Sequence, residues 1–186
     1  LLKKIGKYLY TKLKDLFFVS LSLLGASCAP PARNTGFFLS VDQGTTWQQR
    51  NLVQTDGNAV SLANESIQTL VMHPSDSSTL YAGTSTLGLV KTVNAGESWQ
   101  QLTTSGSILA FAIHPQDTDK LIASRGNQIF LSTDGGEVWS LTFTNQTTQA
   151  ISDLQFDPLN TQRVYASSLS GDIFVSDDSA KSWSSL

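Results

Sequence analysis

Cysteine, histidine and charged residues are all scarce in this sequence. Its 186 residues include one Cys, two His and one Met, and only 15% are Asp, Glu, Lys or Arg. A single cysteine excludes a disulfide within the chain and a zinc site built from several cysteines. Two histidines without any neighbouring ligand spacing offer little to a metal ion. We therefore predict no metal site and no cofactor.

Positive charge is also scarce outside the first 27 residues. That segment holds five lysines and one acid, and the remaining 159 residues hold seven bases and 14 acids, a net charge of −7. An acidic domain repels the phosphate backbone, which argues against nucleic-acid binding. Hydrophobic residues make up 40% of the chain, so its bulk is predicted to fold rather than to remain disordered.

The N-terminal segment has the three parts of a secretory signal peptide. Residues 1–15 are rich in lysine, residues 16–26 form an uncharged apolar run, and small residues stand just before Cys28. This order is typical of a cleaved signal. The apolar core of about a dozen residues is also shorter than the roughly 20 that a spanning helix needs. We predict a signal peptide over residues 1–27.

The position of the only cysteine resembles the lipobox of bacterial lipoproteins. In that family the cysteine is lipidated and becomes the new N-terminus, which implies lipidation of Cys28, although Gly25 stands where the family favours leucine. Residues 28–35, which contain a Pro-Pro pair, would then form a lipidated tether. An aspartate directly after the cysteine would resemble an inner-membrane retention signal, but position 29 holds alanine. The resemblance implies an exported protein, lipid-anchored to a bacterial membrane, with the outer membrane or cell surface favoured. An ordinary signal peptide followed by a free thiol, or an uncleaved amphipathic anchor, are the alternatives.

All four tryptophans close the same octapeptide, at spacings of 52, 40 and 44 residues. The copies read SVDQGTTW, TVNAGESW, STDGGEVW and SDDSAKSW. Their third place holds an acid or an amide, their fifth place a glycine in three copies, and their eighth place tryptophan. In order, these residues are Asp42, Gly44 and Trp47; Asn94, Gly96 and Trp99; Asp134, Gly136 and Trp139; and Asp178, Ala180 and Trp183.

A second landmark, an X-Pro turn, recurs before the last three octapeptides. The pairs His73-Pro74, His114-Pro115 and Asp157-Pro158 lie 41 and 43 residues apart, with β-rich runs on both sides. Proline favours extended geometry in the residue before it, which suits the end of a strand. Each unit reads as strand, X-Pro turn, strand, glycine turn, strand, octapeptide turn and strand. Four strands in about 40–45 residues match one blade of a β-propeller.

The octapeptide resembles the Asp-box, S-x-D-x-G-x-T-W, of BNR-type repeats in sialidases, sortilin and the photosystem II assembly-factor propellers. The resemblance covers residues 36–186 and implies an all-β propeller with four-stranded blades. The residue types suit a turn: aspartate accepts hydrogen bonds from backbone amides, glycine takes a positive φ, and tryptophan can wedge between neighbouring blades. Because Ala180 lacks the freedom of glycine, we expect the fourth turn to be looser or differently turned.

The repeats amount to about three and a half blades. We predict a half blade over residues 36–52 and blades over about 66–102, 107–142 and 150–186. A propeller typically closes with four to eight blades, so we expect this chain to be a fragment of a larger ring. The alternative is a ring shared between chains. The stretched segment from Leu52 to Ser66 is interpreted as an extra loop, either a binding loop or a solvated insertion.

The repeated polar residues do not form a recognisable catalytic set. Asp42, Asn94, Asp134 and Asp178 occupy equivalent places, which indicates turn capping rather than catalysis or calcium binding. His73 and His114 share one repeat slot with an aspartate, which indicates repeat consensus rather than metal ligation.

The sialidase resemblance implies a tyrosine nucleophile and three arginines, and other glycosidases need two carboxyls roughly 5–10 Å apart. Arg33, Arg50, Arg125 and Arg163 match no such motif.

We therefore predict no catalytic residue here, and a membrane-anchored, non-catalytic lipoprotein that acts as a binding or assembly scaffold for a protein or glycan partner. The alternative is the N-terminal part of an exported glycoside hydrolase, of the sialidase or xyloglucanase type, whose catalytic residues lie in further blades.

Overall fold

The structure is a computed structural model that describes residues 36–55, 58–103 and 106–186. Cys28, the predicted signal peptide (1–27) and the predicted tether (28–35) lie outside the described residues. Over the described ranges the regular structure is strand, apart from one 3-10 turn at Leu62–Asn64. The predicted all-β class is therefore confirmed. In these same ranges, no helix has the length and apolar character that crossing a membrane requires.

Two antiparallel sheets of four strands follow the chain order without crossovers. Blade 2 consists of β9 (Phe111–Ile113), β10 (Leu121–Arg125), β11 (Gln128–Ser132) and β12 (Ser140–Thr144). Blade 3 consists of β13 (Ile151–Phe156), β14 (Val164–Ser168), β15 (Ile173–Ser176) and β16 (Ser184–Ser185). In both blades the X-Pro turn joins the first two strands and the octapeptide joins the last two.

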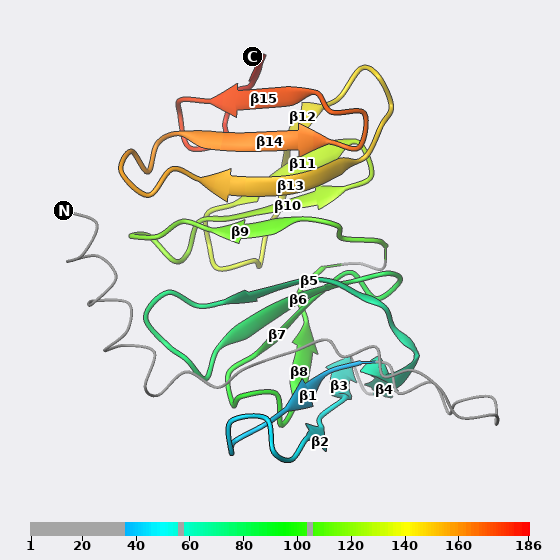
Figure 1. The fold of residues 1–186 in the computed structure, drawn as a ribbon. Helices are drawn as coiled ribbons and strands as arrows, with labels where there is room; N and C mark the ends of the chain where they lie inside the picture. Colours follow the sequence, from blue (N-terminus) through cyan, green and yellow to red (C-terminus); the bar gives the residue numbers. More distant parts are fainter. Residues whose placement is uncertain (1–35, 56–57, 104–105) are drawn as a thin grey trace.

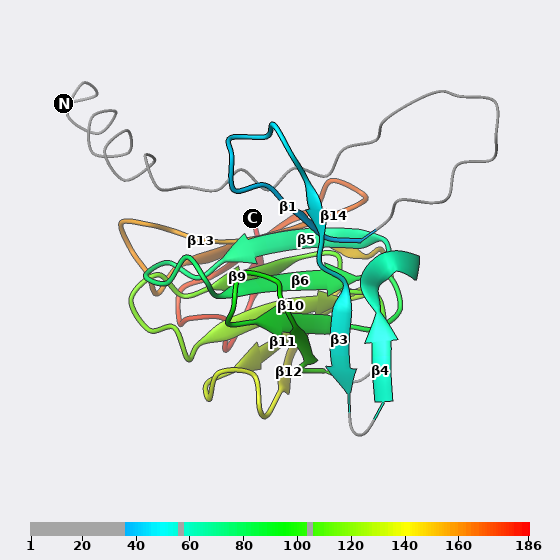
Figure 2. The ribbon, with the colours of Figure 1, turned by 90° about the horizontal axis from the view of Figure 1, so that it is seen from below.

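Blade 1 has the same four strands and two more. It consists of β5 (Ile67–Met72), β6 (Leu80–Thr84), β7 (Leu89–Thr92) and β8 (Trp99–Gln101), and its sheet continues with β3 (Leu52–Thr55) and β4 (Asn58–Ser61). The hairpin β3–β4 joins through β3, which runs parallel to β8 and places Val53 opposite Trp99. Figure 2 shows β3 and β4 beside the stacked sheets. The expectation of an extra loop after residue 52 is therefore wrong, because the segment pairs with the outer strand of blade 1.

The sheets stack face to face, in the way that propeller blades do (Figure 1). The first strands β5, β9 and β13 contact one another in succession, so they form the inner edge of the stack. A separate two-stranded sheet, β1 (Phe38–Leu39) and β2 (Gln48–Gln49), flanks the first octapeptide. The arrangement confirms the predicted propeller architecture with only part of a ring present in the described residues.

The strands at the centre of the stack are buried on both faces. On β10, Leu121 and Ala123 pack in a cluster with residues of blade 1, whereas Ile122 between them packs with residues of blade 3. This alternation follows from the two-residue period of a strand. Three apolar clusters result, one ahead of blade 1 and one in each interface between successive blades.

Candidate functional site

The third residue of each octapeptide caps its own turn. Asp42 Oδ1 accepts the backbone N–H of Thr46 at 2.8 Å, and Asn94 Oδ1 accepts that of Ser98 at 3.0 Å. Asp134 and Asp178 accept equivalent bonds at 3.0 and 2.9 Å, from Val138 and Ser182. The four side chains are thus engaged by the loops that carry them, at separate places along the stack.

These hydrogen bonds keep the carboxylates ionised. Hydrogen bonds from the side chain and backbone of Thr46 lower the pKa of Asp42 to about 2, and those from Ser182 lower the pKa of Asp178 to about 2. The backbone N–H of Val138 lowers the pKa of Asp134 as well. A general acid works best with a pKa near the operating pH. These groups therefore have the electrostatics of turn caps.

The fourth octapeptide turns in the same way as the other three. Ala180 has a φ of +69°, beside +101° for Gly136 at the equivalent place. Its N–H donates to Ser176 Oγ at 2.9 Å, as the N–H of Gly136 donates to Ser132 Oγ at 2.9 Å. The expectation of a looser or differently turned box is therefore wrong. The serine hydroxyl and the aspartate hold Ala180 in a conformation that alanine alone disfavours.

The four tryptophans differ in their surroundings more than in their place in the repeat. The indole N–H groups of Trp47 and Trp139 donate to the carbonyl three residues earlier, at 3.1 and 2.9 Å. That of Trp99 donates instead to the carbonyl of Arg50 at 3.1 Å, and Trp99 is 1% exposed. Trp47 is 37% exposed. Trp183, partly buried, packs between blades 2 and 3.

In blades 1, 2 and 3 the octapeptide turn is also hydrogen-bonded to the X-Pro turn of the same blade. The N–H of Ala95 donates to the carbonyl of Ser78 at 2.8 Å, and the N–H of Gly135 donates to the carbonyl of Asp119 at 2.9 Å. The N–H of Ser179 donates to the carbonyl of Gln162 at 2.8 Å. The same bond thus recurs in blades 1, 2 and 3, and it places both kinds of turn at one end of the strands.

The residue before the proline of each of the three X-Pro turns is a hydrogen-bond acceptor, which explains why two histidines and an aspartate share this position of the repeat. His114 Nδ1 accepts the N–H groups of Gln116 and Asp117 at 3.2 and 3.0 Å. Asp157 Oδ1 accepts the N–H groups of the residues two and three places further on, at 2.8 and 3.1 Å. His73 Nδ1 accepts one such bond at 3.3 Å. An imidazole nitrogen therefore accepts the same backbone hydrogen bonds as a carboxylate oxygen in this turn.

We expect stability to fall as His114 becomes protonated. Burial, together with the charge of Lys120, lowers the pKa of His114, so its ring is neutral at pH 7 and Nδ1 can accept. Because the folded-state pKa lies below the unfolded value, the contribution is present above the unfolded pKa and is lost as pH falls through the folded one. Urea unfolding at pH 7.5 and at pH values between about 6 and 4.5 should show this loss in the wild type. His114→Asp should reduce it, since Asp157 accepts the same bonds at its own turn. An unchanged pH profile in His114→Asp would contradict the assignment.

No sequence pattern indicated that the carboxylate of Glu65 is buried. Glu65 is 7% exposed and accepts the side-chain hydroxyl of Ser85 at 3.0 Å and the N–H of Thr86 at 2.9 Å, as well as the Thr86 hydroxyl. Burial raises the pKa of Glu65, and the hydrogen bonds from Thr86 and Ser85 outweigh it, so the pKa is lowered overall. Its donors come from the turn after β6, so Glu65 fastens the start of blade 1 to that turn.

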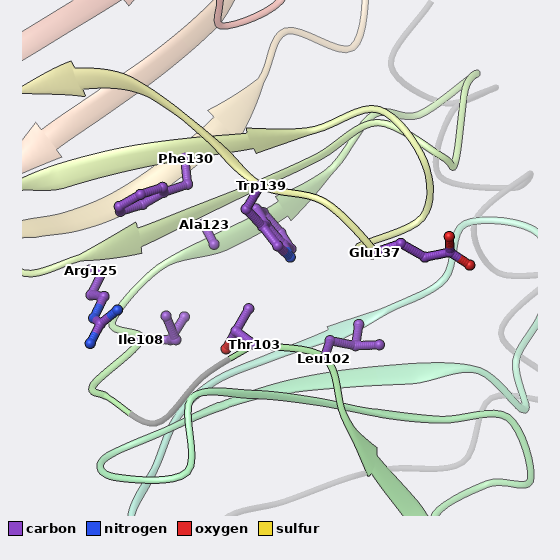
Figure 3. Close-up of a pocket in the computed structure, with 8 residues that line it drawn as sticks. All are labelled: Leu102, Thr103, Ile108, Ala123, Arg125, Phe130, Glu137 and Trp139. Atoms are coloured by element: carbon purple, nitrogen blue, oxygen red, sulfur yellow. The ribbon is translucent and has the colours of Figure 1, made fainter.

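A cavity of about 330 Å³ lies between blades 1 and 2. Apolar side chains form most of its lining, with Arg125 and Glu137 at opposite sides of it (Figure 3). Phe130 from β11 and Trp139 lie on the blade 2 side, and the chain that leaves β8 contributes Leu102 and Thr103. Of the octapeptide residues that were predicted to have a structural role, Trp139 alone lines this cavity. The others lie in turns or in the packed interfaces.

The remaining polar groups are spread over the described chain. Arg50 pairs with Glu97 at 3.1 Å, Arg163 pairs with Asp177 at 2.6 Å, and Arg125 lines the cavity. These three arginines thus lie in different parts of the stack and do not form the three-arginine site of the sialidase resemblance. Among the residues that the structure describes, no three His, Cys, Asp or Glu side chains are grouped closely enough to hold a metal ion.

No protein-family profile matches the chain, and no curated protein matches it either. Solved structures do resemble it. An ancestral GH74 enzyme superposes with a TM-score of 0.67 at 23% identity, over 81% of this chain and 21% of that one. A GH74 xyloglucanase from Xanthomonas campestris gives 0.60 at 17% identity, over 83% of this chain and 28% of that one. YCF48 bound to D1 peptide gives 0.58 at 18% identity, over 89% of this chain and 55% of that one.

At these identities the likeness shows the propeller fold alone. The chain spans about a fifth of the length of the ancestral GH74 enzyme and about half that of YCF48. The two GH74 enzymes and the peptide-bound YCF48 share this arrangement of blades although their functions differ. The function of this protein therefore has to be argued from its own side chains.

Proposed function

We propose that this chain belongs to an exported, lipid-anchored propeller that serves as a non-catalytic binding or assembly scaffold for a protein or glycan partner. The observation that carries the proposal is that the recurring carboxylates and imidazoles serve as hydrogen-bond acceptors within turns. Asp42, Asp134, Asp178 and His114 are all bonded to backbone N–H groups of their own turns. The largely apolar cavity between blades 1 and 2 is a surface suited to binding rather than to proton transfer.

The anchor in this proposal rests on the lysine-rich start, the apolar run and Cys28. A lipid on Cys28 would hold the propeller at a bacterial membrane through the tether of residues 28–35. Incorporation of labelled palmitate into the wild-type chain, and its absence in Cys28→Ser, is the expected result. Equal labelling of both proteins would remove the anchor from the proposal.

A glycoside hydrolase fragment is the second candidate, because two of the similar structures are GH74 enzymes. The two candidates differ in whether the protein cleaves a polysaccharide. We expect no release of reducing sugar when the full-length protein, with any further blades that its gene encodes, is incubated with xyloglucan, and no release of sialic acid from sialyllactose. Measurable hydrolysis, lost on heat denaturation, would favour the enzyme and reject the scaffold.

A further inference from the structure

A second cavity, of about 450 Å³, lies beside the first, and Leu102 and Glu137 line both. On the blade 1 side its lining comes from β3, β7 and β8. On the blade 2 side it comes from the octapeptide turn and from Asp119 in the turn before β10. Its volume is within the range of pockets that bind ligands. Around this cavity, three residues depart from the pattern of the repeat.

The first departure leaves one oxygen of Asp134 without a partner. In the other three octapeptides the seventh residue carries a hydroxyl group that bonds to the side chain at the third place. These pairs are Thr46 with Asp42 at 2.6 Å, Ser98 with Asn94 at 3.0 Å, and Ser182 with Asp178 at 2.6 Å. The third octapeptide holds Val138 instead, and within the described chain Asp134 accepts hydrogen bonds through Oδ1 only. Asp134 lines the cavity, so its Oδ2 can accept a hydrogen bond from a ligand there.

The second departure opens space next to this carboxylate. The fourth residue of the other octapeptides carries a side chain in spite of a positive φ. These residues are Gln43, Ala95 and Ser179, with φ values of +60°, +54° and +60°. The third octapeptide has Gly135, which lines the cavity. A Cβ at Gly135 would lie 3.7 Å from Oδ1 of Asp119, so the space that this glycine leaves is bordered by a second carboxylate.

The third departure adds a cation to the opposite wall. Lys91 of β7 has the same register in blade 1 as Leu131 in blade 2 and Val175 in blade 3. The two equivalent residues are apolar, whereas Lys91 lines the cavity. Its ammonium group lies 5.3 Å from the ring centre of Tyr81 and forms no ion pair with any residue that the structure describes. The ammonium group is therefore available to donate to a ligand.

The lining as a whole offers both donors and acceptors to a ligand. The groups that can donate are Lys91, Gln54 and Gln100, and the carboxylates that accept are Asp119, Asp134 and Glu137. The three carboxylates repel an anion, and the ammonium group on the opposite wall repels a cation. The carboxylates are also not grouped closely enough to hold a metal ion in the described part of the chain. The lining therefore favours an uncharged ligand.

The backbone around the cavity argues against an extended peptide as that ligand. Strand β8 is paired with β7 on one side and with β3 on the other, and β7 is paired with β6 and β8. Strand β3 is likewise paired on both sides, with β4 and β8. The strands of the cavity wall thus present no free edge to which a peptide strand could add. Recognition has to come from side chains.

We propose that the second cavity binds a neutral saccharide unit of a glycan. A sugar hydroxyl group both donates and accepts, so the hydroxyl groups of one ring can donate to Asp134 Oδ2 and Asp119 and accept from Lys91. Hydrogen bonds to charged groups are stronger than those between neutral groups. Val93 and Leu102 give the C–H groups of the ring an apolar contact. This inference rests on the proposed scaffold function and narrows its partner from protein or glycan to a neutral glycan.

A microarray of neutral and acidic oligosaccharides, probed with the full-length protein, tests the class of ligand. We expect binding to neutral oligosaccharides and none to the acidic ones. Titration calorimetry with the neutral oligosaccharide that gives the strongest array signal then measures the Kd. An array on which no neutral oligosaccharide is bound, or only acidic ones are, would overturn the inference.

Three variants locate the binding, and each copies a residue that another blade has at the same place, so that the fold is retained. Val138→Ser gives Asp134 Oδ2 the hydroxyl partner found in the other octapeptides. Gly135→Ser fills the space beside Asp119, and Lys91→Leu removes the cation. Each should weaken binding about tenfold or more. Gln43→Ser, at the same place in the first octapeptide as Gly135 in the third, is the matched control and should leave the Kd unchanged.

Urea unfolding checks that the variants are folded, and Val138→Ser should unfold at the same or a higher urea concentration than the wild type because it adds a hydrogen bond. Saccharide binding that is equally tight in the wild type and in all three variants would reject this cavity as the site. Hydrolysis of xyloglucan by the full-length protein would reject the scaffold whichever way the variants behave, so the two proposals fail through different measurements.

Discussion

Replacing Trp99 with alanine is expected to lower the free energy of unfolding by about 4 kcal/mol. The indole is 1% exposed, packs edge-on against Phe37 with ring centroids 5.0 Å apart, and donates to the carbonyl of Arg50. Truncation would leave a large hole beside Val53 and remove the donor that holds the chain between β2 and β3. The two losses fall on the same interface, so the added hairpin and the two-stranded sheet should both loosen from blade 1.

Trp47→Ala is the matched control for this prediction. Trp47 has the same place in its octapeptide but is 37% exposed and bonds only to its own turn. We expect its replacement to cost about 1 kcal/mol. Urea unfolding followed by circular dichroism measures both variants against the wild type. Similar losses in the two would show that the octapeptide itself, and not burial between sheets, sets the importance of the tryptophan.

The second large effect is expected at Gly96, where alanine should cost about 3 kcal/mol. Gly96 has a φ of +85°, and a Cβ there would lie 2.4 Å from Cε1 of Phe37. Phe37 is buried and held against Trp99, so the ring has little room to move away. The variant therefore combines a disfavoured backbone conformation with a steric clash in the core.

Gly44→Ala separates those two contributions. Gly44 has almost the same φ, +89°, but the nearest atom to its added Cβ would be Trp47 Cζ2 at 3.7 Å, an ordinary contact. We expect a loss of about 1 kcal/mol, from the backbone alone. Thermal and urea unfolding of the pair give the difference. If Gly44→Ala is as destabilising as Gly96→Ala, the contact with Phe37 is not the cause.

The sequence predicted the blades because their turns are local. The octapeptides and the X-Pro pairs specify acceptors and positive φ values within a few residues, so their spacing was enough to identify a four-stranded repeat. The exception, Ala180, shows the limit of residue propensity, because Ser176 and Asp178 supply the hydrogen bonds that keep the turn in shape.

The hairpin and the cavity were not predicted because both depend on contacts between distant parts of the chain. The runs LVQT and NAVS around Asp56-Gly57 do carry a hairpin signal. The parallel pairing of β3 with β8, however, joins residues 46 places apart, such as Val53 and Trp99. The cavity likewise forms between the chain that leaves β8 and side chains of β10 and β11, which only the stacking of blades 1 and 2 brings together.

The bond between the octapeptide turn and the X-Pro turn has a consequence for how such a propeller can evolve. In each of blades 1, 2 and 3 it closes the blade on itself, through a donor and an acceptor that one repeat supplies. A duplicated or deleted repeat therefore carries this turn-to-turn hydrogen bond with it, whereas its apolar faces have to find a new neighbour. Gene duplication can change the number of blades in this way without redesigning any one of them.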